Sequence, residues 1–162
     1  MSPDDAPVLI AARRTPIGTA GRSLATLTAA DLAAPVIRAL ADELEPAVRA
    51  DLRDVVLGNC MGPGGDVARV AALQAGIPVS VPGLTVDRQC GSGLAAIVLA
   101  VSMLRAEPGV VLAGGVESAS TAPWRFWPPA DGAEPTRYER APFAPAALGD
   151  PDMGEAADLL AR

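Results

Sequence analysis

Short apolar runs alternate with longer segments of helical periodicity along this chain. Four of the runs end at turn-forming residues, which predicts strands at residues 8–10, 55–57, 84–88 and 110–113. Between them, helices are expected from about residue 28 to 44, over 66–75 and over 90–104. This alternation of strand and helix predicts an α/β fold with a mostly parallel sheet and right-handed crossovers.

The first expected helix has a recognisable start. Thr28 and Asp31 have the spacing of a capping box, in which each side chain binds a backbone N–H of the other. An apolar stripe follows at every fourth position, at Leu32, Val36, Leu40 and Leu44. Pro35 lies inside the stripe, so the helix is expected either to kink there or to begin its regular part nearby. Pro46 is expected to end it.

The third expected helix has no polar face. Residues 94–104 are apolar almost throughout, and therefore on every side of a helix. Leaving several Leu, Ile and Val side chains in water costs roughly 1.5–3 kcal/mol each. The run is too short for a bilayer span of about 20 residues, so no membrane is expected. Since one sheet covers only one side of a helix, we expect a second layer of protein over it.

The last third of the chain has a different character. Residues 116–151 are rich in proline and contain all the aromatic residues, which predicts a loop excursion rather than another strand and helix. Trp124, Phe126 and Trp127 either pack this excursion onto its own domain or a neighbour, or line a ligand channel. A further helix is expected to begin at Asp152.

Composition excludes several classes of function. The formal charge of −6 and the absence of a basic block argue against a nucleic-acid partner. Residues 1–5 lack the pattern of a secretory signal, so a cytoplasmic location is expected. Cys60 and Cys90 are then expected as thiols rather than as a disulfide. With no histidine and only two cysteines, the chain is expected to hold no metal.

Cys90 is the candidate nucleophile. A thiol at the start of a helix meets backbone dipoles that favour the thiolate, the form that attacks carbonyl carbon. Gly91, Ser92 and Gly93 leave room for a substrate, and the Cys90 N–H is placed to donate to an oxyanion. The alternative is an inert buried cysteine beside glycines needed for close packing. Because the chain has no histidine, a general base has to be absent or come from another polypeptide.

The segment TVDRQCGSGLAAI, residues 85–97, resembles the nucleophile segment of the thiolases. Further matches follow in the family's order: RTPIG at 14–18, VLGN at 56–59, ARVAALQAGIP at 68–78, LAGGVESAS at 112–120 and Met153-Gly154. The resemblance implies the N-terminal half of a thiolase, a βαβαβαβ core with a buried cysteine helix, completed to αβαβα layers by another chain. It implies a thiolase core at residues 1–115 and the start of the CoA-covering loop domain at 116–162.

The resemblance also implies chemistry. Cys90 would form an S-acyl intermediate from acyl-CoA, its backbone N in the oxyanion hole, for Claisen condensation or thiolysis. A companion chain would supply the histidine and the second cysteine, because Cys60 matches no family motif and is expected as a small core residue. No cofactor is bound covalently, and CoA or acyl-CoA is the substrate. Met153 would form a wall of the CoA pocket, and Leu84 to Arg88 would pair two copies of the chain.

Three hypotheses follow for the role of the chain. In the first it is the nucleophile-bearing half of a split acyltransferase, inactive or weak alone. In the second it is a non-catalytic, thiolase-like subunit that stabilises or regulates a partner. In the third it is a fragment of a longer thiolase.

Overall fold

The computed structural model describes residues 6–129 and 131–161. The chain divides into two compact units, Met1–Pro123 and Trp124–Arg162. The first unit contains the predicted alternation of strands and helices. The second contains most of the proline-rich segment, whose residues 116–123 belong to the first unit.

A parallel sheet forms the centre of the first unit. Its described strands are β1 (Leu52–Gly58), β2 (Gly83–Val86) and β3 (Val110–Gly115), in the order β2-β1-β3. Val55 and Val56 are adjacent on β1 and both are 0% exposed. Because neighbouring side chains point to opposite faces, both faces of this central strand are covered.

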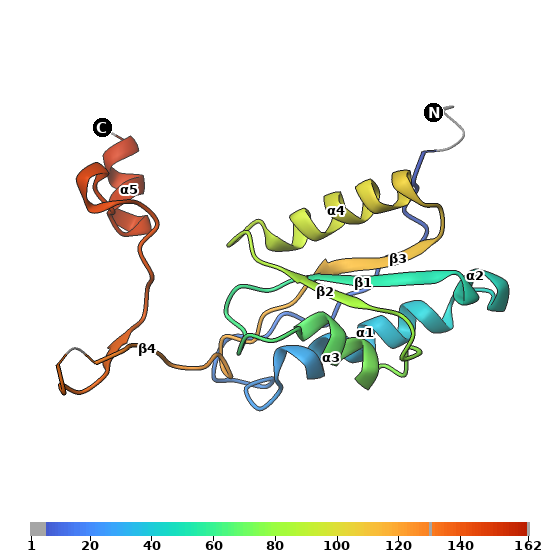
Figure 1. Cartoon of the computed structure of the whole chain (residues 1–162), viewed down its shortest axis with the longest axis horizontal. Helices are drawn as coiled ribbons and strands as arrows, with labels where there is room; N and C mark the ends of the chain where they lie inside the picture. Colours follow the sequence, from blue (N-terminus) through green and yellow to red (C-terminus); the bar gives the residue numbers. More distant parts are fainter. Residues whose placement is uncertain (1–5, 130, 162) are drawn as a thin grey trace. The chain divides into compact units, whose positions relative to one another are not determined.

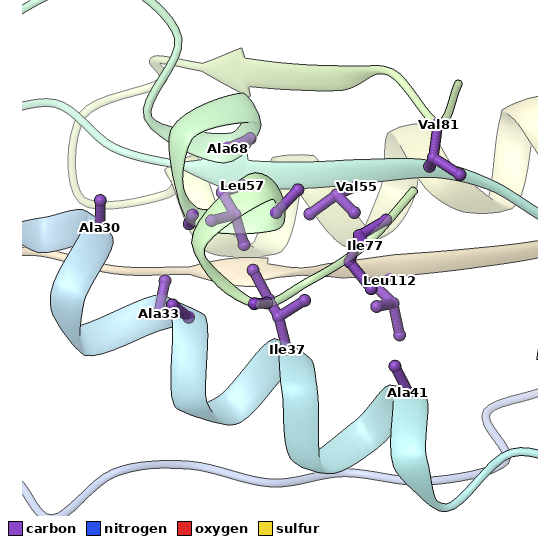
Figure 2. Close-up of a cluster of buried hydrophobic side chains, with 14 of the residues drawn as sticks. Ala30, Ala33, Ile37, Ala41, Val55, Leu57, Ala68, Ile77, Val81 and Leu112 are labelled. Carbon is purple, nitrogen blue, oxygen red and sulfur yellow. The ribbon is translucent and has the colours of Figure 1, made fainter. Parts of the chain in front are cut away.

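Helices lie on both faces of this sheet (Figure 1). One face carries α1 (Ala29–Asp42) and α3 (Val67–Gln74), and the other carries α4 (Ser92–Ala106). Figure 2 shows side chains of α1, among them Ile37 and Ala41, directed at Leu57 and Leu112 of the sheet. Alanines supply most of the α1 contact surface, which lets the helix backbone approach the strands closely.

The α1 helix begins as the sequence predicts. The Thr28 side chain accepts a hydrogen bond from Asp31 N, and the Asp31 carboxylate accepts one from Thr28 N, which completes the capping box. Pro35 lies within the assigned helix, which begins well before it, at Ala29. Pro46 does not end α1. It is the first residue of a short helix, α2 (Pro46–Ala50), where a missing N–H costs nothing.

The strand predicted at residues 8–10 is wrong. Val8, Leu9 and Ile10 are 76%, 84% and 64% exposed, and no described strand pairs with them. Their apolar character and the β-branched Val8 and Ile10 favour a strand, but a strand forms only where a neighbour completes its backbone hydrogen bonds. The sheet therefore has three described strands where the pattern predicted four.

Two predicted boundaries around the cysteine are also displaced. The strand predicted to reach Arg88 ends at Val86, and the helix predicted to begin at Cys90 begins at Ser92. The intervening residues form a turn with its own hydrogen bonds, described below. Cys90 is therefore a turn residue rather than the first residue of the helix.

The α4 helix is covered on one side only. Ala96 and Ala100 pack against the sheet at 0% and 5% exposure, whereas Leu94, Ile97 and Val98 are 64%, 45% and 58% exposed. By length and composition alone, Gln89–Ala106 is apolar enough to cross a membrane. A core helix that a second layer of protein covers has the same composition, and that layer stays a prediction.

The second unit contains a hairpin, β4 (Arg125–Trp127) paired with β5 (Thr136–Tyr138). Trp127 stacks on Tyr138 with ring centroids 4.5 Å apart, and the Arg137 guanidinium lies 4.2 Å from the Trp124 ring. A 3-10 helix, Ala146–Leu148, and α5 (Met153–Leu160) follow. This unit thus has a hairpin within the predicted loop excursion, and its last helix begins where expected.

Candidate active site

Cys90 lies on a tight turn between β2 and α4, at the carboxyl edge of the sheet, and its side chain is exposed. Gln89, immediately before it, has a φ of 50°. Few residues other than glycine adopt this left-handed conformation, and it persists only when the surroundings hold it. The turn therefore exposes the Cys90 side chain to solvent, and the left-handed conformation of Gln89 costs a small amount of free energy.

Side chains on both sides of Gln89 hold this conformation. Asp87 Oδ1 accepts a hydrogen bond from Gln89 N at 2.8 Å. Ser92 Oγ donates to Gln89 O at 2.6 Å and accepts from Arg88 N at 2.8 Å. Ser92 is 4% exposed, so its hydroxyl exchanges these bonds with water only if the turn opens. Asp87 and Ser92 therefore position the cysteine.

Three glycines allow the first turn of α4 to rest on the sheet. A Cβ on Gly58 would lie 2.2 Å from the carbonyl carbon of Ser92, and one on Gly115 would lie 2.9 Å from Gly93 Cα. Real side chains do not tolerate such contacts. The close contacts at the ends of β1 and β3 thus set the distance between the sheet and the first turn of α4. They thereby also set the position of Cys90.

Cys60, the second cysteine, lies at the same edge of the sheet on the loop after β1. Glu117, which follows β3, binds this loop: its carboxylate accepts hydrogen bonds from Cys60 N, Met61 N and Asn59 Nδ2. Asn59 is buried and its Nδ2 also donates to Val116 O at 2.9 Å. These bonds tie the ends of two neighbouring strands together.

Burial raises the pKa of the Cys60 thiol to about 11, and the hydrogen bond and charge of Glu117 add to the effect. The charges of Asp87 and Cys90 make smaller contributions, which places Cys60 in the electrostatic neighbourhood of the candidate nucleophile. A thiol with so high a pKa is protonated at neutral pH, whereas a thiolate is needed for attack. Neither cysteine forms a disulfide.

The other predicted site residue, Met153, lies in the second unit. It is the first residue of α5 and is 70% exposed. Its role as a wall of a CoA pocket stays a prediction. Within residues 6–129 and 131–161, no group of three or more His, Cys, Asp or Glu side chains could hold a metal ion.

The residues that hold the Cys90 turn and the Cys60 loop were not predicted from the sequence. An Asp two residues before a left-handed residue is a known turn signal, so Asp87 could have been found from the sequence. Glu117 could not, because it is 57 positions from the Cys60 backbone that it binds. Only the parallel pairing of β1 with β3 brings the two together.

Comparison with known proteins identifies the family of the chain. Residues 7–141 match the family model described as thiolase, N-terminal domain. A Bacillus subtilis protein named "Putative acetyl-CoA C-acetyltransferase YhfS" is 46% identical over 155 residues, covering 95% of this chain and 38% of that protein. "Putative acetyl-CoA C-acetyltransferase VraB" of Staphylococcus aureus is 44% identical, covering 96% of this chain and 41% of that protein.

Among solved structures, the chain is similar to the crystal structure of the Bacillus anthracis acetyl-CoA acetyltransferase. The TM-score is 0.66 at 35% identity, over 76% of this chain and 33% of that one. The chain thus spans about two fifths of the length of the two curated relatives above. With its α/β core and parallel sheet, it belongs to the thiolase family and comprises the family's N-terminal domain.

Proposed function

We propose that this chain supplies the nucleophile of a thiolase-type acyltransferase and that Cys90 is the residue acylated. The observation that carries the proposal is the exposed Cys90 on a strained turn, held by Asp87 and Ser92 within the family's nucleophile motif. The names of the two relatives support acetyl-CoA as a donor. CoA is then a substrate and not a resident cofactor.

The proposed step is a thioester exchange. The Cys90 thiolate attacks the carbonyl carbon of acyl-CoA, the bond to the CoA sulfur breaks, and the CoA thiolate leaves and takes up a proton. The negative oxygen formed in between needs N–H donors, for which the Cys90 N–H is the predicted one. Attack on the S-acyl group by a carbanion completes a condensation, and attack by CoA completes a thiolysis.

The proton transfers require groups that this chain lacks. It contains no histidine, and Cys60, with a pKa of about 11, is a poor base at neutral pH. We therefore assign the histidine and the second cysteine to further polypeptide, here called the companion, either a separate chain or the remainder of a longer one. The exposed face of α4, formed by Leu94, Ile97 and Val98, is the surface that the companion would cover. The chain alone would be inactive or weak.

Self-association is a further part of the proposal. The outer edge of β2 carries no described strand, so the predicted segment Leu84 to Arg88 is open to a second copy. A cytoplasmic location fits the acyl-CoA substrate. Sedimentation velocity of the complex over a range of concentrations tests the pairing.

Mass spectrometry tests the acylation directly. The chain, alone and with its companion, is incubated with acetyl-CoA and digested. An acetyl adduct on Cys90, larger with the companion and lost in Cys90→Ser but kept in Cys60→Ser, supports the proposal. If Cys90 stays unmodified under both conditions, the proposal is wrong.

The absence of histidine keeps a second function open: a non-catalytic subunit that stabilises its partner. In that case Cys90→Ala leaves the activity of the intact complex unchanged. The acylation proposal instead requires that this substitution abolish it.

A further inference from the structure

Two thiols lie at the carboxyl edge of the sheet, on neighbouring loops. Cys60 is on the loop after β1, and Cys90 is on the turn between β2 and α4, at the same end of the sheet (Figure 1). Cys60 is half-buried, Cys90 is exposed, and both are free thiols. The proposed acyl transfer uses only Cys90, which leaves the Cys60 thiol without a function.

The backbone next to Cys60 contacts the Cys90 turn on both of its sides. Asn59 N donates to Val86 O, at the end of β2, at 3.0 Å. Gly58 lies so close to the start of α4 that a Cβ on it would be 2.2 Å from backbone of the first residue of that helix. Since consecutive Cα atoms are about 3.8 Å apart, each cysteine lies within a short reach of these contacts.

The electrostatics of Cys60 agree with this proximity. Burial contributes most to the raised pKa of its thiol, Glu117 contributes next, and the charges of Asp87 and Cys90 on the turn add to it. The energy between two charges falls with their separation, so these contributions come from groups close to Cys60. The Cys60 thiol also hydrogen-bonds to Glu117, whose carboxylate is thus a proton acceptor beside it.

The two thiols differ in how readily they react with an oxidant. A thiolate reacts with a hydroperoxide far faster than a thiol does. Cys60, with a pKa of about 11, is protonated at neutral pH. Cys90 is exposed and lies just before the N-terminus of α4, whose backbone dipoles favour a thiolate. The first oxidation therefore falls on Cys90.

We propose that Cys60 and Cys90 form a reversible disulfide when a hydroperoxide oxidises Cys90. This rests on the proposed function, because it concerns the same nucleophile, and it names a modification that stops acylation. In the first step the Cys90 thiolate attacks a peroxide oxygen, the O–O bond breaks, and hydroxide leaves and takes up a proton, which gives a sulfenic acid.

The second step closes the disulfide. The Cys60 sulfur attacks the Cys90 sulfur, and the S–O bond breaks. The Cys60 proton passes to Glu117 and from there to the departing hydroxide, which leaves as water. Overall, two electrons pass from the two thiols to the peroxide, which is reduced to water.

The disulfide would protect the nucleophile from irreversible damage. Further oxidation turns a sulfenic acid into a sulfinic acid, which a dithiol does not reduce, whereas a disulfide returns to two thiols by exchange. A dithiol therefore restores Cys90 after peroxide treatment only where Cys60 has captured the sulfenic acid first.

Peptide mapping of the complex with the companion tests the proposal. Trypsin places Cys60 in the peptide 54–69 and Cys90 in the peptide 89–105. After treatment with hydrogen peroxide and blocking of remaining thiols, the two peptides should be joined, and dithiothreitol should separate them. The proposal is overturned if Cys90 instead links to a cysteine of the companion, is found only as sulfinic acid, or stays reduced.

Cys60→Ser provides a second measurement. Before oxidation its Cys90 should be acetylated by acetyl-CoA as in the wild type. After peroxide and then dithiothreitol, the acetylation recovered should be at least tenfold lower than in the wild type. Met61→Leu, which removes a neighbouring oxidisable side chain that is 44% exposed, is the matched control and should recover fully. Equal recovery of Cys60→Ser and the wild type overturns the proposal.

The two proposals fail in different ways. Joined peptides in a complex whose Cys90 is never acetylated keep the disulfide and refute the acyl transfer. Acetylation of Cys90 in a complex that never yields joined peptides does the reverse.

Discussion

Ser92 Oγ donates a hydrogen bond to the carbonyl oxygen of Gln89 at 2.6 Å, across the residue that carries the candidate nucleophile. The same hydroxyl accepts from Arg88 N, so one buried side chain binds the backbone on both sides of the left-handed residue. The position of Cys90 therefore depends on a neighbour that takes no part in bond making.

Ser92→Ala should loosen this turn. Removing the hydroxyl leaves the Arg88 N–H without its acceptor, which costs about 1–3 kcal/mol of stability. We expect Cys90 acylation by acetyl-CoA to slow at least tenfold in the complex, with substrate affinity less affected. Single-turnover kinetics with urea denaturation measures both. Ser102→Ala, which removes an exposed hydroxyl bonded to Val98 O on the same helix, should behave as wild type.

Gly58→Ala should displace the start of α4. The added methyl group would lie 2.2 Å from the carbonyl carbon of Ser92, and the three nearest atoms all belong to the Ser92–Gly93 backbone, which leaves little room to relax. We expect a loss of about 1–3 kcal/mol in the free energy of unfolding. Gly154→Ala in α5, where nothing lies within 4 Å, should be neutral or slightly stabilising. Equal stability of the two variants would contradict the close contact.

Cys60 should make stability fall at alkaline pH. Its pKa is raised from 9.0 to about 11 in the folded chain, so between these values the unfolded state releases a proton that the folded state keeps. The contribution is fully present below pH 9 and is lost as pH rises through about 11. Denaturant titrations from pH 8 to 11 should show a shallower decline for Cys60→Ser.

Glu117→Gln separates the causes of that shift. Removing the carboxylate charge should lower the pKa of Cys60, but not to 9.0, because burial is the largest contribution. The pH dependence of Cys60 alkylation, followed by mass spectrometry, reports the change. An unaltered profile would mean that Glu117 does not contribute.

Val98→Asp should leave this chain folded and block the companion. Val98 is 58% exposed, so the carboxylate stays in water until a second layer covers the helix, where burying it is costly. We expect an unchanged circular dichroism melt and at least tenfold weaker assembly. Val70→Asp on α3, at an exposed valine on the opposite face of the sheet, is the matched control. Normal assembly of Val98→Asp would mean that this face is not an interface.

Local signals in the sequence predicted much of the fold. Thr28 and Asp31 predicted the start of α1. Asp66 and the apolar periodicity after it predicted both ends of α3 to within one residue. The motif around Cys90 led to the family that the comparisons show. These features are local because caps and periodicity depend on residues only a few positions apart.

The errors have two causes, a long-range partner that is not among the described strands and a local turn. Val8, Leu9 and Ile10 have strand-forming side chains but no described partner, and the sequence alone gave no way to see that. The two-residue shift of the α4 start arises from the Ser92 bonds, which compete with helix formation at Cys90.

By itself, the sequence determined the alternation of strands and helices from α1 to β3, the parallel α/β class and the identity of the candidate nucleophile. Only the tertiary structure decided that Cys60 and Glu117 meet at the same edge as Cys90, and that one edge of β3 has no described strand beside it. The physical reason is distance along the chain. Propensity and periodicity act between neighbours, whereas burial, charge and strand pairing depend on which remote segments the sheet brings together.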